Sequence, residues 1–193
     1  MKIIIPELSL VTLIGASGSG KSTFARQHFL PTEIISSDTC RGLVSDDETN
    51  QDATQDAFDI LNYIAGKRLN RGHLTVIDAT NTQSADRQHL LKIAKEHHCI
   101  PVAIVLNVPE EICRNLTRPD RQFGQHVIKR HVQNIRRSLK GLHREGFRQV
   151  YILNSLEQIA AVEITRELLW NNKKHEHGPF DIIGDIPGLF HSK

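Results

Sequence analysis

Short apolar runs alternate with segments of helical spacing along most of the chain. The apolar runs have the length and residue types of strands, and they cover residues 9–14, 33–36, 74–77, 101–106 and 150–153. Helical patterns lie between them, at residues 22–30, 51–71, 84–94, 110–117 and 126–145. Strands that alternate with helices form a parallel sheet that is covered on both faces. The pattern therefore predicts an α/β fold with a parallel sheet flanked by helices.

The pattern changes near residue 171. Residues 171–179 are polar and rich in residues that break helices, which is typical of a linker. A short apolar run at 180–183 then predicts one more strand. We therefore expect one domain over residues 1–170, followed by a linker and a short stub over residues 171–193.

Composition narrows the class of protein. With 193 residues, 39% of them hydrophobic, the chain can bury a core and does not have the composition of a disordered protein. No apolar run approaches the roughly 18 residues that a spanning helix needs, and the run after Met1 is too short for a signal peptide. Cys40, Cys99 and Cys113 are scattered, without the spacing of a metal site. We expect reduced thiols, a cytoplasmic location and no membrane partner.

A glycine-rich loop follows the first apolar run. Residues 15–22, GASGSGKS, match the phosphate-binding pattern G-x-x-x-x-G-K-[ST] between an expected strand and an expected helix. Glycines let the backbone curl so that its N–H groups converge on phosphate oxygens, and the helix start adds a positive dipole. We expect Lys21 to reach the β- and γ-phosphates of ATP and the Ser22 hydroxyl to ligate Mg²⁺. The residues expected to bind the nucleotide here are Gly15, Ser17, Gly18, Ser19, Gly20, Lys21, Ser22 and Thr23.

This loop occurs in ATPase switches and in kinases alike, and the acid after the second apolar run favours a kinase. Asp38 follows residues 33–36, and ligands of open α/β sheets lie at the carboxyl ends of strands. Asp38 would accept the proton of an attacking hydroxyl, and Arg41 would hold an acidic acceptor. The alternative, equally open from these residues, is that Asp38 caps the following segment with the aid of Thr39.

A second acid ends the third apolar run. Asp78 has the position of an acid that supports Mg²⁺, and Asn81 would hydrogen-bond a loop or a substrate. A simple turn stabilised by the side chain of Asn81 is an equally open interpretation.

The net charge of +2 hides two oppositely charged segments. Between Asp38 and Asp59 there are seven acids and one base, whereas between Arg114 and Arg148 there are ten Lys or Arg residues and two acids. A basic segment in a nearly neutral chain indicates a polyanionic ligand, although many basic helix faces are simply solvated.

The basic segment begins with a pair of arginines. Arg114 and Arg118 are four residues apart, so on a helix they share one face, and Pro119 ends that helix. With no carboxylate expected beside them, they suggest a lid whose arginines neutralise the transferring phosphate. The alternative is exposed arginines paired with neighbouring acids.

Further along, the basic surface continues without aromatic residues. Contacts with a nucleic-acid backbone and a solvated face are equally compatible with Lys129, Arg130, Arg136 and Arg137. The histidines of this segment, His126, His131 and His143, are expected to be surface groups.

Together these motifs resemble the kinase module of bacterial polynucleotide kinase-phosphatase, an RNA-repair family. The matching stretches are GASGSGKST at 15–23, SSDTCRG at 36–42, IDATNTQ at 77–83, RNLTRPDRQ at 114–122, KGLHREGFRQVYILNS at 140–155 and WNNKKHEHGPFDIIGDI at 170–186. The resemblance implies a P-loop kinase fold with a helical lid. It also implies transfer of the γ-phosphate of ATP to the 5′-hydroxyl end of RNA or DNA.

The resemblance also implies residue roles and partners. Asp38 would be the general base, Arg41 would hold the phosphate next to the terminal nucleoside, and Arg114 and Arg118 would be lid arginines on the ATP phosphates. Ligase and methyltransferase components of a repair complex are implied as partners. Two other functions stay open, namely a small-molecule kinase and a non-catalytic nucleotide-binding scaffold of a repair complex.

One departure concerns residues 184–188. Family members carry Gly-Asp-x-His-Gly there, at the start of a metal-dependent phosphatase domain, whereas this chain has Gly-Asp-Ile-Pro-Gly. Proline cannot ligate a metal, so we expect residues 171–193 to be a linker and truncated stub without phosphatase activity.

Overall fold

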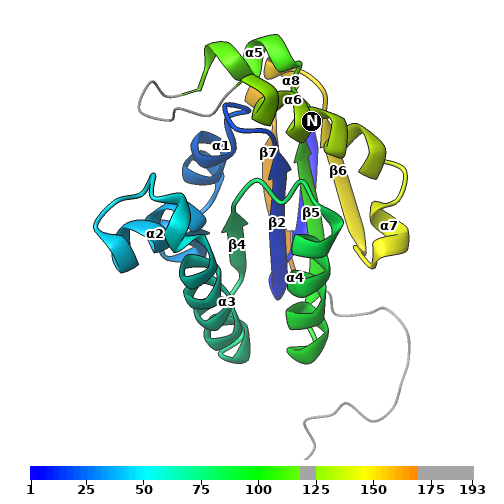
Figure 1. Ribbon diagram of the computed structural model, residues 1–193. Coiled ribbons are helices and arrows are strands. Elements are labelled where there is room, and N and C mark those ends of the chain that lie inside the picture. Colours follow the sequence, from blue (N-terminus) through cyan, green and yellow to red (C-terminus); the bar gives the residue numbers. More distant parts are fainter. Residues whose placement is uncertain (118–124, 169–193) are drawn as a thin grey trace, which may run out of the picture.

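The computed structural model describes residues 1–117 and 125–168, and its centre is a five-stranded parallel sheet (Figure 1). The strand order is β3-β4-β2-β5-β6, which places β2 in the middle. The strands are β2 (Ser9–Gly15), β3 (Ile34–Ser36), β4 (Thr75–Asp78), β5 (Ile100–Leu106) and β6 (Gln149–Leu153). The predicted parallel sheet is confirmed.

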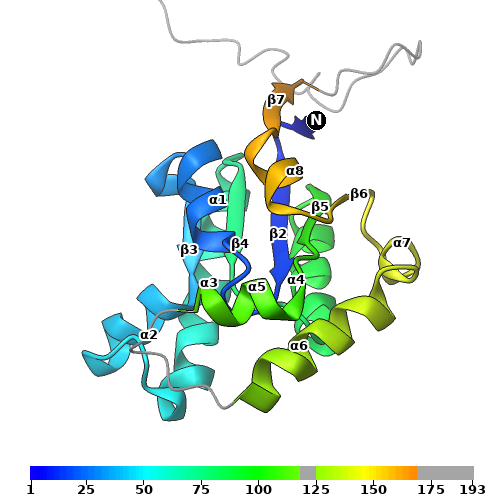
Figure 2. The same ribbon diagram turned by 90° about the horizontal axis from the view of Figure 1, so that it is seen from above.

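Helices cover the sheet on both faces. Figures 1 and 2 show α3 (Thr54–Asn70) and α4 (Ser84–Glu96) on one face and α1 (Lys21–His28) on the other. The helices α5 (Glu110–Asn115) and α6 (Gln125–Ser138) lie across the edge at which the strands end. The carboxyl edge of the sheet is therefore covered, as the predicted helical lid requires.

The side-chain periods explain why these segments fold as they do. All seven residues of β2 are buried, as expected for a central strand covered on both faces. Along α3 the buried positions recur every four residues and pack against the sheet, at Ala57, Leu61, Ala65 and Leu69. Each buried leucine stabilises the fold by about 1.5–3 kcal/mol relative to an exposed one.

The hydrophobic pattern does not predict four elements, which are β1 (Lys2–Pro6), α2 (Ser37–Ser45), α8 (Leu156–Ala160) and β7 (Glu163–Glu167). The first and last of them form a second, two-stranded parallel sheet in which Ile3 lies opposite Ile164. Three of the five residues of β7 are charged. Strand β7 pairs with β1 at the other end of the chain, so the local hydrophobic pattern does not predict it.

Two predicted helices are interrupted. The segment 51–71 begins as the 3-10 helix η2 (Gln51–Ala53) before α3 starts. A separate 3-10 helix, η1 (Pro31–Glu33), lies between α1 and β3 and belongs to neither of the two. The segment 126–145 divides into α6 and α7 (Leu142–Glu145), because the chain turns at residues 139–141 and Gly141 becomes the N-cap of α7.

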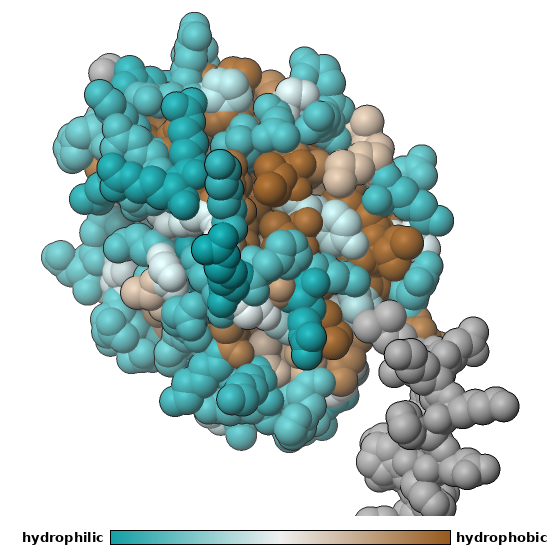
Figure 3. Space-filling view, turned by 90° about the vertical axis from the view of Figure 1, so that its right-hand side faces the viewer, coloured by the Kyte–Doolittle hydropathy of each residue, from teal (hydrophilic) through white to brown (hydrophobic). Residues whose placement is uncertain are grey.

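Some expectations fall beyond the described part of the chain. The strand expected at 180–183 and the boundary expected after residue 170 lie outside it. In residues 1–117 and 125–168, no helix has the length and apolar character needed to cross a membrane. The side of the molecule that carries β6 and α7 is mainly hydrophilic with some hydrophobic patches, and the edge strand β6 is only half-buried up to Ile152 (Figure 3).

Candidate active site

The phosphate-binding loop joins β2 to α1 at the carboxyl edge of the sheet (Figure 1). Gly18 and Gly20 have φ angles of 77° and 89°, in the left-handed region that other L-residues adopt at a cost. Gly20 is the N-cap of α1, where no side chain caps the helix and no acidic residue lies in the first turn. The backbone N–H groups at the start of α1 therefore suit an anionic ligand.

Side chains inside the loop also fit a phosphate. The ammonium of Lys21 donates hydrogen bonds to the carbonyls of Gly15 (2.9 Å) and Ala16 (2.8 Å), and the residue is only 8% exposed. The hydroxyls of Ser17 and Ser19 are buried and have no hydrogen-bond partner among the described residues. Because buried polar atoms are normally paired, these hydroxyls fit a bound group that supplies the missing partners.

Helix α5 packs directly on the loop. A Cβ atom added at Gly18 would overlap the backbone carbonyl of Cys113 and lie 2.6 Å from the Thr117 hydroxyl oxygen. Gly18 is therefore required for its backbone angle and for this close approach. The motif explains the angle, whereas only the packing of α5 reveals the contact.

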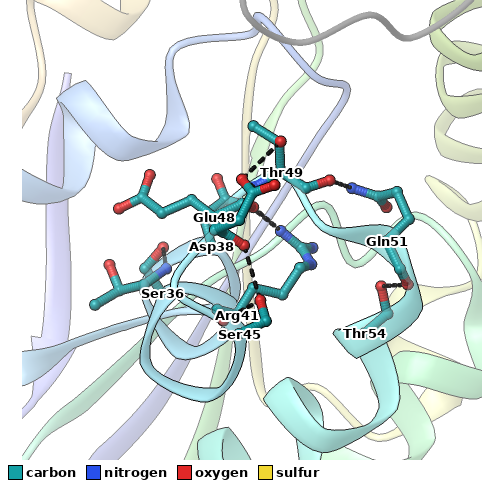
Figure 4. A network of polar contacts seen from close by, with 10 residues as sticks. Ser36, Asp38, Arg41, Ser45, Glu48, Thr49, Gln51 and Thr54 are labelled. Atoms are coloured by element: carbon teal, nitrogen blue, oxygen red, sulfur yellow. Dashed lines mark hydrogen bonds and ion pairs between the residues drawn. The ribbon is translucent and has the colours of Figure 1, made fainter.

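The acid and the base at the end of β3 meet in an ion pair (Figure 4). Nη1 of Arg41 donates to Asp38 Oδ1 at 2.6 Å and to the carbonyl of Glu48 at 2.9 Å. The Ser36 hydroxyl caps α2 by accepting from the Thr39 N–H, so the alternative that Asp38 is the cap does not hold. Asp38 instead lies in the first turn of α2, on the same sheet edge as the phosphate-binding loop.

Arg41 is unusually buried for an arginine. It is 8% exposed, and burial lowers the pKa of its guanidinium, which nevertheless stays protonated in proteins. Its Nε is buried without a partner among the described residues. A buried cation with an unused donor can accept an additional anionic partner.

The segment after β4 supports the loop from the neighbouring strand. Asp78 is buried and lies opposite Ser36 in the sheet. Asn81 has a φ of 48°, and its amide donates to the carbonyl of Leu13 at 2.8 Å. This contact is with strand β2 and not with a loop, and the left-handed backbone is typical of the turn that was the alternative. A contact between Asn81 and a substrate stays a prediction.

The two expected lid arginines have different outcomes. Arg114 lies on α5 and forms an ion pair with Glu110, four residues earlier. The expectation that no carboxylate lies beside it was therefore wrong. Arg118 lies outside the described residues, so its expected role stays a prediction.

His131 corrects another expectation, because it is not a simple surface group. Its Nδ1 is buried and has no hydrogen-bond partner in the described part of the chain. Burial, followed by the nearby charges of Lys21 and Arg130, lowers the pKa of His131 to about 4. A signal was present in the sequence, since His131 shares the helix face of the buried residues Ile128 and Ile135.

The family model described as "AAA domain" matches residues 10–142, which include the loop, Asp38, Arg41 and Arg114. A protein of Acanthamoeba polyphaga mimivirus, named as a bifunctional polynucleotide phosphatase/kinase, is 29% identical over 108 residues. That match covers 55% of this chain and 23% of the viral protein. The chain therefore corresponds to a minor part of this curated relative.

Solved structures agree on the fold. A chain of the Pnkp1/Rnl/Hen1 RNA repair complex superposes with a TM-score of 0.58 at 22% identity, over 72% of this chain and 46% of that one. Kti12 of Chaetomium thermophilum, solved in complex with ADP-AlF3, superposes with a TM-score of 0.52 at 16% identity, over 78% of this chain and 93% of that one. At these identities the likeness shows the fold alone. The chain therefore belongs to the AAA domain family, and its fold is that of P-loop kinases.

Proposed function

We propose that this protein is an ATP-dependent polynucleotide 5′-hydroxyl kinase that acts in nucleic-acid end repair. The observation that carries the proposal is the ion pair between Asp38 and Arg41, which lies on the same sheet edge as a phosphate-binding loop. A loop alone accounts for a nucleotide. An acid and a buried cation beside it account for an acceptor that has both a hydroxyl and a phosphate.

The donor side uses the loop. The N–H groups at the start of α1 and the Lys21 ammonium would hold the phosphates of ATP, with Lys21 exchanging its carbonyl partners for phosphate oxygens. The hydroxyl of Ser22, at the second position of α1, would ligate Mg²⁺. A bound Mg²⁺ neutralises charge on the phosphates and is usually held by few protein ligands.

On the acceptor side, Asp38 would take the proton of the 5′-hydroxyl. The hydroxyl oxygen then forms a bond to the γ-phosphorus, the bond from that phosphorus to the bridging oxygen breaks, and ADP leaves. The hydrogen bond from Arg41 holds the Asp38 carboxylate in one orientation. The guanidinium of Arg41 would bind the phosphate next to the terminal nucleoside.

The charge of α6 favours a polynucleotide over a small metabolite. No acidic residue occurs between Gln125 and Arg144. Four exposed cations of α6 make no ion pair with another described residue, and they are Lys129, Arg130, Arg136 and Arg137. Such a surface attracts a chain of phosphates, which a small acceptor does not have.

The relatives support the same proposal. The viral relative is named as a polynucleotide phosphatase/kinase, and a similar fold occurs in an RNA repair complex. We propose on this basis that Arg114 and Arg118 act as lid arginines and that ligase and methyltransferase proteins are partners.

The test is transfer of label from γ-labelled ATP with Mg²⁺ to a 5′-hydroxyl oligonucleotide. The matched control is the same oligonucleotide carrying a 5′-phosphate, which has no hydroxyl to accept the label. Label on the first substrate alone supports the proposal. Absence of label on any oligonucleotide, with the protein folded, contradicts it, and label on a small metabolite instead indicates a small-molecule kinase.

The polynucleotide part has its own test. Arg136→Gln together with Arg137→Gln should raise KM for a 20-nucleotide acceptor and weaken its dependence on salt, while KM for ATP stays unchanged. The control is Lys92→Gln with Lys95→Gln, which removes the same charge from exposed positions of α4. Equal effects of the two pairs would show that α6 does not contact the strand.

A further inference from the structure

Arg87 is completely buried and joins three separate segments. The residue belongs to α4 and is 0% exposed. Its Nε and Nη2 donate to the two carboxylate oxygens of Glu145, both at 2.7 Å, in a two-pronged ion pair. Nη2 also donates to the hydroxyl of Ser138 at 3.0 Å, and Nη1 donates to the carbonyl of Asn81 at 2.9 Å. Every nitrogen of this guanidinium is therefore engaged.

The Asn81 contact leads to the phosphate-binding loop. Asn81 is 1% exposed, and its amide holds the carbonyl of Leu13 in β2. The carbonyl of its neighbour Thr80 accepts the N–H of Gly15, the first residue of the loop, at 3.1 Å. Arg87 thus donates a hydrogen bond to the backbone of residues 80–81, and the same short segment fixes the start of the loop.

The contacts with Glu145 and Ser138 lead to the roof of the site, by which we mean helices α5 and α6 across the sheet edge that carries the phosphate-binding loop. Ser138 is the last residue of α6 and Glu145 the last residue of α7. Helix α6 contacts α5, the helix that packs against Gly18. It also carries His131, whose pKa is lowered in part by the charge of Lys21. Arg87 therefore connects the roof with residues 80–81, the segment that fixes the start of the loop.

We propose that Arg87 is a positioning residue of the nucleotide site, which fixes the distance between the phosphate-binding loop and the helices that cover it. The proposal deepens the proposed function, because it takes the loop to be an ATP site. Arginine suits this position because its planar fork satisfies a carboxylate, a hydroxyl and a carbonyl at once. A lysine has a single nitrogen and cannot keep these contacts in their directions.

A purely structural role is the competing explanation, and a paired substitution separates the two. Removing Arg87 alone leaves the partly buried Glu145 carboxylate without its cation, which destabilises the fold. Replacing both partners by apolar residues, Arg87→Met with Glu145→Leu, avoids that penalty and is often neutral for stability. This double variant still lacks the contacts with Asn81 and Ser138.

The chain offers a matched control for this variant. Arg166 in β7 forms a similar two-pronged ion pair with Glu33, with both distances 2.7 Å. Glu33 ends η1 just before β3 begins, so this pair lies at the opposite end of β3 from Asp38. The control is Arg166→Met with Glu33→Leu, and a second comparison sets Arg87→Lys against Arg166→Lys.

The experiment measures the ATP affinity of the folded 193-residue chain without any acceptor, together with the KM for ATP. We expect the Arg87→Met/Glu145→Leu variant to bind ATP roughly tenfold more weakly and its KM for ATP to rise by a similar factor. The Arg166 control should keep ATP affinity, whatever it does to the melting temperature. Arg87→Lys should lie between the double variant and the wild type.

Wild-type ATP affinity in the folded Arg87→Met/Glu145→Leu variant would overturn the proposal, as would an equal loss in the control. If the double variant does not fold, Arg87→Lys and Arg166→Lys decide by the same comparison. The affinity measurement does not depend on phosphate transfer. A protein that binds ATP with the predicted sensitivity but phosphorylates no acceptor would retain this role of Arg87 and refute the kinase proposal.

Discussion

The phosphate-binding loop and the corner formed by Asp38, Arg41 and Glu48, which we propose to hold the acceptor and call the acceptor corner, lie on one sheet edge but are built in different ways. The loop at residues 15–22 depends on backbone N–H groups, glycine conformations and one lysine, all within eight consecutive residues. The acceptor corner depends on side chains, with Asp38 held by Arg41, and Arg41 held in turn by the carbonyl of Glu48. Because the two parts share no side chain, we expect a substitution in the acceptor corner to leave ATP binding by the loop intact, and a substitution in the loop to leave the ion pair between Asp38 and Arg41 intact.

The strongest test of this separation is Asp38→Ala. Without a general base, kcat for transfer should fall by roughly 10²–10⁴-fold, while ATP affinity should stay within about twofold of the wild type. Isothermal titration of ATP and a label-transfer assay on the same sample provide the two values. A parallel loss of ATP affinity would show that the acceptor corner is not independent of the loop.

The next effect concerns His131 of α6, which is close enough to Lys21 of the phosphate-binding loop for that charge to help lower its pKa. Its pKa is about 4 in the folded protein and near 6.5 when unfolded, so the unfolded chain binds the proton more readily. Stability should therefore be unaffected above pH 6.5 and decrease as the pH falls from 6.5 toward 4, by up to about 3 kcal/mol.

The measurement is the free energy of unfolding in urea between pH 4 and pH 7, for the wild type and His131→Gln. The variant should lose most of this pH dependence. An unchanged slope would show that other groups cause it. His143, an exposed histidine of α7, provides the control His143→Gln.

A smaller effect distinguishes two demands on the loop itself. Gly18 and Gly20 both have positive φ angles, so alanine at either position should cost about 1–2 kcal/mol of stability. A Cβ at Gly20 meets no atom within 4 Å, whereas at Gly18 it overlaps the carbonyl of Cys113. Gly18→Ala should therefore be the more damaging, both in melting temperature and in ATP affinity, and equal effects would show that α5 yields easily.

The smallest expected effect is that of Glu110→Gln, in the first turn of α5. The ion pair between Glu110 and Arg114 is partly exposed and joins residues one helical turn apart. Such pairs contribute about 0.3–0.5 kcal/mol, so the melting temperature should hardly change. Transfer should remain near the wild-type rate, because the variant leaves Arg114 able to reach the nucleotide. A large loss of stability would instead show that Glu110 anchors α5.

Much of the fold was predictable because it follows from local patterns. The five strands of the main sheet match the apolar runs, and the loop lies where the motif places it. The errors lie where partners are distant or where local signals conflict. Helix α2 has a polar first turn and follows a three-residue strand, and β7 finds its partner at the other end of the chain.

The candidate site shows the same division. The sequence indicated Lys21, Asp38 and Arg41 because each follows a strand at a recognisable position, and the roles proposed for them stay predictions. It gave no indication that Arg87 matters, since arginine in the first turns of a helix is usually solvated. Its partners Ser138 and Glu145 lie 51 and 58 residues away.

By itself, the sequence determined the alternation of strands and helices and the phosphate-binding loop. These features depend on the period of side chains and on the conformational freedom of glycines within a few residues. Only the tertiary structure decided that α5 closes against Gly18 and that Arg87 joins α6 and α7 to the segment that fixes the start of the loop. Those contacts join groups whose distance depends on how the whole chain packs, and such packing leaves no local pattern in the sequence.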